Sequence, residues 1–171
     1  MKLVVAVDRE WGIGYKGELL ARVRADLRYF QSLTKGNIVI LGSKTLATFP
    51  GGRVLKDRVN LVLSRNPEYS PEGAIVLHSI EALLEELKKY DTDTVYVIGG
   101  SNVYHQLLPY CDTAYVTKFE KSFEKDAFFD NLDESDEWEL ASVGEDMVTN
   151  PETDTESDMT FRFCTYKRII K

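Results

Sequence analysis

The hydrophobic residues of this chain fall into short runs that alternate with segments of helical patterning. Apolar runs rich in β-branched residues and bounded by turn residues predict buried strands. These runs cover residues 3–8, 37–41, 59–63, 74–77, 94–98 and 113–119. Between them, apolar positions spaced three or four residues apart predict helices over residues 24–33, 80–89 and 101–108, and a further helix from residue 43 to the Pro50-Gly51-Gly52 break.

Local signals place some of the ends of these elements. Ser43 and Ser79 stand at the start of helical segments and are expected to cap them, because a serine hydroxyl can accept hydrogen bonds from the free amides of a first turn. Residues 11–17 contain Gly12, Gly14 and Gly17 and are expected to form a glycine-rich loop after the first strand.

The alternation of strands and helices ends after residue 119. Residues 138–144 and 159–169 predict two more strands, and the polar, acidic segment 145–158 between them predicts a long, mobile connection. We therefore expect an α/β fold: a predominantly parallel central sheet of about eight strands, flanking helices and an antiparallel C-terminal hairpin at the sheet edge. No linker or internal repeat divides residues 1–171, which are expected to form a single domain.

Three glycine-bearing motifs follow three of the predicted strands, after Val7, Leu41 and Ile98. In a parallel sheet, the carboxyl ends of the strands form the edge at which ligands bind. The sequence therefore predicts one large site along that edge.

Composition narrows the possible functions. The chain has 171 residues, 43% of them apolar, but no apolar run approaches the ~20 residues that span a bilayer. The N-terminal apolar stretch is too short for a signal peptide, so a cytoplasmic protein is expected. Its 28 acidic and 21 basic residues give a net charge of −7, which argues against general binding of nucleic acid.

The cysteines and histidines point away from disulfide and metal chemistry. Cys111 and Cys164 form no CxxC motif and are expected to be free thiols in a reducing compartment. His78 and His105, the two histidines, are not spaced as metal ligands, so no metal site is expected. A monomer is expected because no segment shows an unmatched apolar stripe.

The motifs at the strand ends suit an anionic ligand. Glycine lets a backbone approach a ligand closely, and free amides at a helix start can bind phosphate. These features coincide in Gly42-Ser43-Lys44-Thr45 and in Gly99-Gly100-Ser101, and Ser64-Arg65 adds a hydroxyl and a guanidinium at another strand end. A tight turn and solvated surface charges would use the same residues, and Gly99-Gly100 lacks the full G-x-G-x-x-G fingerprint. The pattern therefore suits a phosphorylated dinucleotide without identifying it.

Asp26 has two interpretations. An aspartate near a helix start is often only a cap or a partner of the helix dipole. Alternatively, Leu27 and Phe30 shield a functional carboxylate, whose pKa would be raised and which could orient or help to protonate a nitrogen heterocycle.

Taken together and in this order, six segments resemble the dihydrofolate reductase family over essentially the whole chain. Each segment alone is a weak signal, but six of them in register are specific. The segments are Gly12-Ile13-Gly14-x-x-Gly17-x-Leu19, Ala25-Asp26-Leu27-x-x-Phe30, Ile40-Leu41-Gly42-x-x-Thr45, Arg58-x-Asn60-x-Val62-Leu63-Ser64, Val97-Ile98-Gly99-Gly100-x-x-x-Tyr104 and Tyr115-Val116-Thr117.

The resemblance implies an NADPH-dependent enzyme that reduces 7,8-dihydrofolate to 5,6,7,8-tetrahydrofolate by hydride transfer. It implies that Asp26, with Thr117 as its partner, holds the amidine edge of the pterin, and that Arg58 pairs with the α-carboxylate of the glutamate tail. The other implied substrate-binding residues are Val4, Val5, Leu27, Phe30, Phe49 and Ile98. The implied cofactor-binding residues are Ala6, Ile13, Gly14, Gly42, Ser43, Lys44, Thr45, Ser64, Arg65, Gly99, Gly100, Ser101, Asn102 and Tyr104.

The sequence departs from the family pattern at two places. Leu20-Ala21 stands where the family usually has Pro-Trp, and Ser43 stands where many relatives carry arginine. Lys44 and Arg65 are expected to compensate for the second departure, because electrostatic preference depends on the sum of nearby charges. The first leaves two alternatives open: a reductase of the same fold that acts on a riboflavin-pathway pyrimidine, or a non-catalytic protein that binds NADPH or folate.

Overall fold

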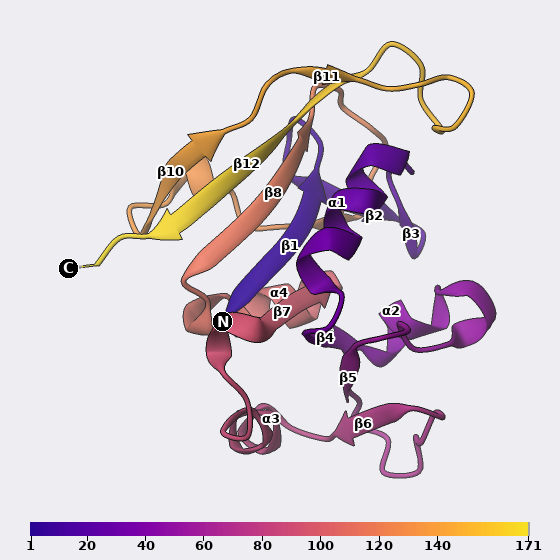
Figure 1. Cartoon of the computed structure of the whole chain (residues 1–171), viewed down its shortest axis with the longest axis vertical. Helices are drawn as coiled ribbons and strands as arrows, with labels where there is room; N and C mark the ends of the chain where they lie inside the picture. Colours follow the sequence, from indigo (N-terminus) through magenta and orange to yellow (C-terminus); the bar gives the residue numbers. More distant parts are fainter. Residues whose placement is uncertain (171) are drawn as a thin grey trace.

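The computed structural model describes residues 1–170, in which one large sheet runs through the chain (Figure 1). Its strand order is β10-β12-β8-β1-β7-β4-β5-β6, and β11 pairs with β12. β1 pairs in parallel with β7 and β8, β4 with β7 and β5, and β5 with β6, whereas β12 is antiparallel to both β8 and β10. The strands are β1 (Lys2–Val7), β4 (Ile38–Gly42), β5 (Val59–Leu63), β6 (Ala74–Leu77), β7 (Val95–Gly99), β8 (Thr113–Phe119), β10 (Trp138–Val143), β11 (Met147–Val148) and β12 (Thr160–Arg168). The predicted α/β sheet with its C-terminal antiparallel hairpin is confirmed.

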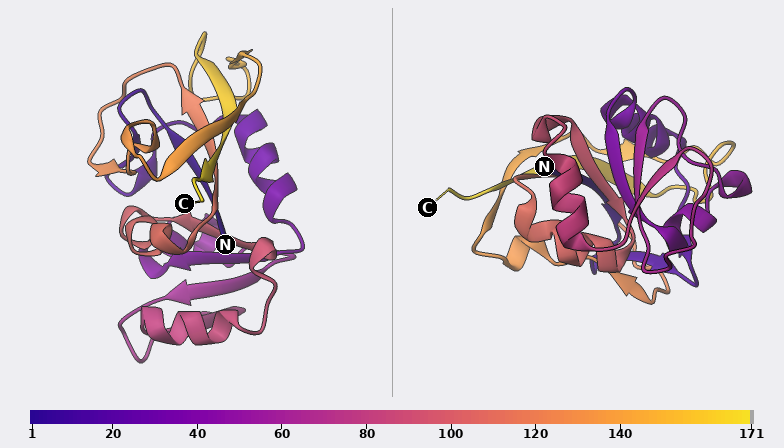
Figure 2. Two further views of the ribbon diagram at one scale, coloured as in Figure 1. Left: turned by 90° about the vertical axis from the view of Figure 1, so that its left-hand side faces the viewer. Right: turned by 90° about the horizontal axis from the view of Figure 1, so that it is seen from below.

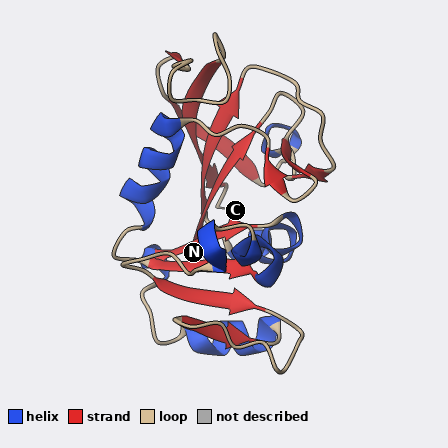
Figure 3. Ribbon diagram, turned by 90° about the vertical axis from the view of Figure 1, so that its right-hand side faces the viewer, coloured by secondary structure: helices blue, strands red, loops and turns tan. Residues whose placement is uncertain are grey.

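Helices cover both faces of the sheet (Figure 3), because its parallel strands are apolar on both sides. In β4, Ile38 and Ile40 belong to the main core with residues of α3 and α4, whereas Val39 and Leu41 pack in a separate cluster with Leu46 of α2. Figure 2 shows α1 and α4 on opposite sides of β1. The helices are α1 (Arg24–Thr34), α2 (Ser43–Ala47), α3 (Ile80–Leu87) and α4 (Ser101–Leu107), with short 3-10 turns at η1 (Pro50–Gly52), η2 (Thr92–Thr94), η3 (Leu108–Tyr110) and η4 (Leu132–Glu134).

The expectation of a glycine-rich loop over residues 11–17 is wrong. These residues contain β2 (Gly12–Tyr15), which pairs with β3 (Glu18–Leu19) and with β9 (Ala127–Phe128) in a second, three-stranded sheet. The partner β9 lies more than a hundred residues further along the chain, so no local pattern announces the pairing. We call the β2–β3 unit the hairpin.

One of the two expected serine caps is also wrong. Ser79 caps α3, because its hydroxyl accepts a hydrogen bond from the amide of Ala82 at 3.0 Å. Ser43 is instead the first helical residue of α2, and Gly42 takes the N-cap position without a side-chain cap. The strand β4 runs directly into α2, so the residue that changes conformation is the last residue of the strand.

The acidic connection 145–158 contains a short strand, β11, and contacts the start of α1. β11 pairs Met147 with Phe161 and Val148 with Thr160. The Asp154 carboxylate accepts a 2.8 Å hydrogen bond from the Arg24 amide, in the first turn of a helix whose N-cap residue, Val23, provides no side-chain cap. A residue distant in sequence therefore satisfies one of the free amides of α1.

Asp8, which follows β1, anchors the hairpin to the sheet. Its buried carboxylate accepts hydrogen bonds from the amides of Glu10 (2.9 Å), Gly12 (2.8 Å) and Phe123 (3.0 Å), and Lys125 Nζ lies 2.7 Å from Oδ2. Burial alone would raise the pKa of Asp8, but Lys125 and the three amides together lower it below 3.8. The aliphatic part of Lys125 occupies the space that a Cβ would need at Gly12.

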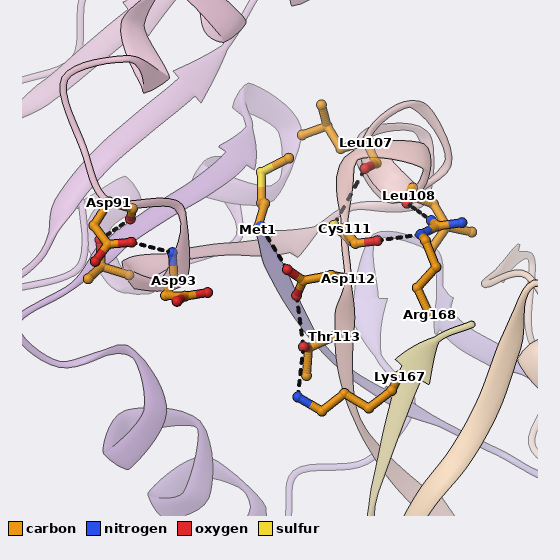
Figure 4. A network of polar contacts seen from close by, with 11 residues as sticks. Met1, Asp91, Asp93, Leu107, Leu108, Cys111, Asp112, Thr113, Lys167 and Arg168 are labelled. Carbon is orange, nitrogen blue, oxygen red and sulfur yellow. Dashed lines mark hydrogen bonds and ion pairs between the residues drawn. The ribbon is translucent and has the colours of Figure 1, made fainter. Parts of the chain in front are cut away.

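The opposite end of β1 is held by a polar network near the N-terminus (Figure 4). Asp112 Oδ2 lies 3.9 Å from the N-terminal ammonium, and its Oδ1 accepts a 2.8 Å hydrogen bond from Thr113 Oγ1. Arg168, at the end of β12, donates to the carbonyl oxygens of Cys111 (2.8 Å) and Leu108 (2.6 Å).

Cys111 and Cys164 are free and buried, and burial raises the pKa of the Cys111 thiol to about 12. Among residues 1–170, no helix combines the length and the apolar character that crossing a membrane requires.

Asp8→Asn is expected to lower the free energy of unfolding by about 2–4 kcal/mol near neutral pH, because an amide NH2 would face donors that now have a carboxylate acceptor. The lowered pKa of Asp8 means that its contribution is present above pH 3.8 and is lost as the pH falls through the folded-state pKa. Urea unfolding at pH 7 and near pH 3 measures both effects. Glu10→Gln, at an exposed carboxylate of the same cluster, serves as the control and should change stability little. A loss as large at pH 3 as at pH 7 would show that the carboxylate charge is not the stabilising element.

Candidate functional site

A cavity of about 1410 Å³ opens along the carboxyl ends of β1, β4, β5, β6 and β7. The parallel pairing of these strands brings their ends to one edge, as the sequence predicts. Every residue that the sequence analysis singled out for binding lines this cavity, with the exception of Thr117. They are Val4, Val5, Ala6, Ile13, Gly14, Asp26, Leu27, Phe30, Gly42, Ser43, Lys44, Thr45, Phe49, Arg58, Ser64, Arg65, Ile98, Gly99, Gly100, Ser101, Asn102 and Tyr104.

Thr117 reaches the site through Asp26. In the β1–β8 register Thr117 lies opposite Ala6, a residue that lines the cavity, and its hydroxyl donates a 2.6 Å hydrogen bond to Asp26 Oδ1. Burial raises the pKa of Asp26 to about 6, although the hydrogen bond from Thr117 acts in the opposite direction. This rise agrees with the functional interpretation of Asp26, in which apolar surroundings raise the pKa of the carboxyl group. At neutral pH the group is mostly ionised, and its second oxygen remains available to a ligand.

Apolar side chains surround this carboxylate. Leu27 and Phe30 lie on the same helix, α1, while Phe49 and Ile98 come from the segment after α2 and from β7. Leu27 is 42% exposed although it is apolar, and it lines the cavity. A flat heterocycle could therefore contact apolar surface and still hydrogen-bond to Asp26.

Arg58, which precedes β5, contacts the C-terminal end of α1, whereas Asp26 lies near its N-terminal end. Its Nε donates to the carbonyl oxygen of Lys56 at 2.8 Å, and one terminal nitrogen donates to Thr34 Oγ1 at 3.0 Å. These bonds fix the guanidinium and leave further N–H groups for a carboxylate. Burial lowers the pKa of Arg58 from its ordinary value, but a guanidinium still remains charged.

The glycines form a wall that has no room for side chains. A Cβ at Gly99 would lie 3.3 Å from the Tyr104 ring, and one at Gly100 would lie 3.1 Å from Thr45 Oγ1. Tyr104 is itself fixed, because its hydroxyl donates a 2.6 Å hydrogen bond to the Val4 carbonyl in the core. The backbone at Gly99 and Gly100 and the Thr45 hydroxyl on α2 therefore lie side by side on the cavity surface, where a narrow phosphorylated ligand can approach both.

Cationic and hydroxyl groups gather beside this wall. Lys44 and Arg65 are exposed and line the cavity together with Ser43 and Ser64. None of these four residues forms an ion pair with an acidic side chain in the described part of the chain. Their positive charge is therefore available to an anionic ligand, even on a protein whose net charge is −7.

Sequence reasoning missed several lining residues. His78 and Ser79 follow β6 at the same sheet edge, so the strand-end argument applied to Ile98 could have found them. Lys16, Gly17, Glu18 and Leu19 also line the cavity, because the hairpin lies beside β1. The sequence analysis placed the motif after Val7 at this edge but assigned ligand contacts only to Ile13 and Gly14 within it.

Ala21, at the first departure from the family pattern, does not line the cavity. It is buried in a cluster with Val23, Phe119 and Phe161, and the following residue, Arg22, lines the cavity instead. The backbone of Arg22 is held by Thr155, whose amide donates to the Arg22 carbonyl at 3.1 Å and whose hydroxyl accepts from the Arg22 amide at 2.9 Å. This segment is therefore fixed by the acidic connection.

Comparison with known proteins gives a consistent result. A family model described as dihydrofolate reductase matches residues 1–168. The chain is 32% identical over 169 residues to the dihydrofolate reductase of Staphylococcus haemolyticus, covering 99% of this chain and 96% of that protein. It is 36% identical over 184 residues to the putative dihydrofolate reductase of Caenorhabditis elegans, covering 99% and 97%.

A solved structure is also similar. It is that of dihydrofolate reductase from Enterococcus faecalis complexed with NADP(H) and RAB-propyl, with a TM-score of 0.85 and 34% sequence identity, covering 99% of this chain and 96% of that one. The family model and these relatives extend over nearly the whole chain, which therefore belongs to the dihydrofolate reductase family.

Proposed function

We propose that this chain catalyses the NADPH-dependent reduction of 7,8-dihydrofolate to 5,6,7,8-tetrahydrofolate. One observation carries the proposal: a single cavity joins the hydrogen-bonded Asp26–Thr117 pair to Arg58 on one side and to the glycine wall with Lys44 and Arg65 on the other. A pterin, its glutamate tail and a phosphorylated dinucleotide require these three kinds of surface. Family membership supports the same activity.

The donor set of this chain fits NADPH. Gly99 and Gly100 leave room for a pyrophosphate to approach the backbone, with Thr45 and Ser101 as hydroxyl donors beside it. Lys44 would contact the same pyrophosphate, and Ser64 and Arg65 would hold the 2′-phosphate. Ala6, Ile13, Gly14 and Tyr104 would contact the nicotinamide end. The remaining cofactor contacts are assigned to Gly42, Ser43 and Asn102. When bound, the cofactor would supply the reducing equivalent.

Asp26 would orient the substrate. Its Oδ1 already accepts the Thr117 hydroxyl, so Oδ2 can accept N–H groups from the amidine edge of the pterin. Val4, Val5 and Ile98 would contact the pterin, and Leu27, Phe30 and Phe49 would hold it together with the benzoyl group and exclude water. Arg58 would bind the α-carboxylate of the tail through its remaining N–H groups. The chain thus contributes placement and electrostatics, and water would carry the proton to N5.

The proposal also covers the domain organisation, the location, the oligomeric state and the partners of the protein. Residues 1–171 would form one domain and act as a cytoplasmic monomer with small-molecule ligands and no nucleic-acid partner. The large sheet, which takes strands from β1 through to β12 along the chain, supports a single domain, and the net charge of −7 supports the absence of a nucleic-acid partner.

The direct test follows the absorbance of NADPH with purified protein, with and without dihydrofolate. Dihydrofolate-dependent oxidation that an antifolate blocks is the expected result. Reduction of a phosphoribosyl pyrimidine in place of dihydrofolate would favour the related reductase, and NADPH binding without any turnover would favour a non-catalytic binding protein.

Asp26→Asn is expected to lower kcat by about 100-fold or more near neutral pH. An asparagine amide carries no charge and has only one acceptor oxygen, so it cannot accept from both Thr117 and the pterin. Steady-state kinetics and NADPH binding measured on the same preparation check this. The dissociation constant of NADPH should change little, since Asp26 belongs to the substrate end of the cavity. A variant with wild-type kcat would remove Asp26 from the mechanism.

The same substitution should stabilise the fold, because the raised pKa of Asp26 means that the ionised form is disfavoured in the folded state. The unfolded carboxyl ionises near 3.8 and the folded one near 6, so the wild type loses stability as the pH rises between these values. Above pH 6 the cost amounts to about 2–3 kcal/mol. Asp26→Asn should therefore be more stable than the wild type at pH 7.5, and the difference should fall to about 0.5 kcal/mol near pH 4 in urea unfolding. An equal difference at both pH values would contradict the assigned charge effect.

Arg58→Lys is expected to raise the KM for dihydrofolate by about tenfold with a smaller change in kcat. An ammonium group cannot reproduce the fixed, bidentate contact with a carboxylate. Arg53→Lys, at an exposed arginine outside the cavity, is the matched control. If both variants gave the wild-type KM, the tail-binding role of Arg58 would be wrong.

A further inference from the structure

A second hollow runs along the outer face of α1, beside the main cavity. Its volume is about 710 Å³, and the residues that line it lie on α1 or directly after it: Arg24, Leu27, Arg28, Gln31, Ser32 and Lys35. Residues three or four positions apart share one face of a helix, so these side chains form a single row. All of them are exposed, and three are cationic. We call this row the α1 groove.

The α1 groove adjoins the substrate end of the main cavity. Leu27 and Gln31 line both hollows. Arg58, to which the proposed function assigns the α-carboxylate of the glutamate tail, donates to Thr34 Oγ1, and Lys35 of the groove follows Thr34 in the chain. A tail that leaves the main cavity beside Arg58 therefore emerges next to the α1 groove.

The cations of the α1 groove have few acidic neighbours. Arg24, Arg28 and Lys35 form no ion pair within residues 1–170. The Asp154 carboxylate accepts a hydrogen bond from the Arg24 amide and so partly offsets the charge of that residue. No carboxylate from the described part of the chain lines the groove itself. Arg28 and Lys35 therefore keep their positive charge available to an anion.

This distribution of charge does not favour the helix that carries it. Arg24 lies in the first turn of α1, where the helix dipole disfavours a cation. Arg28 lies four positions further along, where two like charges repel each other. The net charge of the chain is −7, so a row of cations does not follow from its composition. Local charges that oppose the stability of their own element are expected at functional sites.

We propose that the α1 groove binds a chain of carboxylates attached to the tail of the substrate, and that the enzyme therefore prefers dihydrofolate with several γ-linked glutamates to dihydrofolate with one. The inference rests on the proposed function, because it extends the substrate of the same site. When Arg58 binds the α-carboxylate of the first glutamate, the γ-carboxylate remains as the point of extension. Each further γ-linked glutamate then adds one free carboxylate, which the cations of the groove can bind.

The length of the groove limits how many glutamates it can bind. Between Arg24 and Lys35 an α-helix rises about 16 Å. An extended γ-linked glutamate adds roughly 6 Å to a chain, because its side-chain methylenes become part of that chain. About two or three added glutamates would therefore span the groove, and any beyond them would extend into water.

The binding energy must come from the sum of several weak contacts. A single exposed ion pair contributes little. The added carboxylates, however, are tethered to a substrate that is already bound, so they meet the groove at a high effective concentration. Salt screens exposed charges, so the preference for a long tail should weaken as the ionic strength rises.

The test measures the binding of dihydrofolate with one, two, four and six glutamates to the full chain by isothermal titration calorimetry. At an ionic strength of about 0.05 M, the dissociation constant should fall by about tenfold between one and four glutamates and change little from four to six. At about 0.5 M, the ratio of the constants for one and four glutamates should shrink to about twofold or less. A four-residue tail whose added carboxylates are replaced by carboxamides should bind like a single glutamate, because it has the length without the charge.

Variants of the groove identify the cations responsible. Arg28→Gln should lower the ratio of the two constants by about threefold, and Arg28→Gln with Lys35→Gln should reduce it to about twofold or less. Arg28→Lys should retain most of the ratio, because an exposed row of carboxylates requires charge more than a fixed geometry. Arg53→Gln is the matched control: it removes one positive charge from an exposed arginine outside both hollows and should leave the ratio unchanged.

A wild-type ratio near one at low ionic strength would overturn the proposal. So would a ratio that the double variant leaves intact or that the carboxamide tail reproduces. NADPH-dependent reduction of dihydrofolate, assayed on the same preparations, separates this inference from the proposed function. Turnover without any dependence of binding on tail length refutes the inference alone, whereas tail-dependent binding without turnover supports the inference and refutes the proposed activity. Absence of binding for every probe would refute both.

Discussion

The parallel pairing of β1 with both β7 and β8 is the constraint on which the rest of the structure depends. It aligns the carboxyl ends of the central strands, and each motif that follows such an end then faces one cavity. The same register places Thr117 opposite Ala6 and so brings a hydroxyl to Asp26 from a strand far along the chain. Residues that are distant in sequence become one site because the strands that carry them point the same way.

Two carboxylates, Asp8 buried and Asp26 partly buried, serve this arrangement at different energetic cost. Asp8 is surrounded by donors that lower its pKa, so its charge stabilises the junction of β1, the hairpin and the segment around Phe123. Asp26 has one donor from the protein and an apolar setting, so burial raises its pKa and the charged form is left partly unsatisfied. An unsatisfied acceptor in a cavity is available to a ligand, and it reduces stability until the ligand binds.

Charge is distributed unevenly on this acidic chain. Most lysines and arginines with close acidic partners lie away from the cavity, as Arg162 and Lys118 do, whereas Lys44 and Arg65 face it. Exposed ion pairs contribute little to stability, but cations at a concave surface attract an anionic ligand in proportion to their sum.

The sequence by itself determined the alternation of strands and helices, the antiparallel C-terminal hairpin and the sheet edge that carries the site, because each follows from local patterning or from the rule that ligands bind at parallel strand ends. It also determined the family, since the six segments match in register. Only the tertiary structure decided the rest. The residues around Gly12 are a strand because β9 pairs with them, and Ser43 begins α2 because β4 runs directly into that helix. The acidic connection lies against the start of α1 because Asp154 and Thr155 bind the backbone of Arg22 and Arg24, and His78 lines the cavity because β6 pairs with β5. These outcomes depend on partners distant in sequence, and a local pattern carries no information about which distant backbone will supply a hydrogen bond.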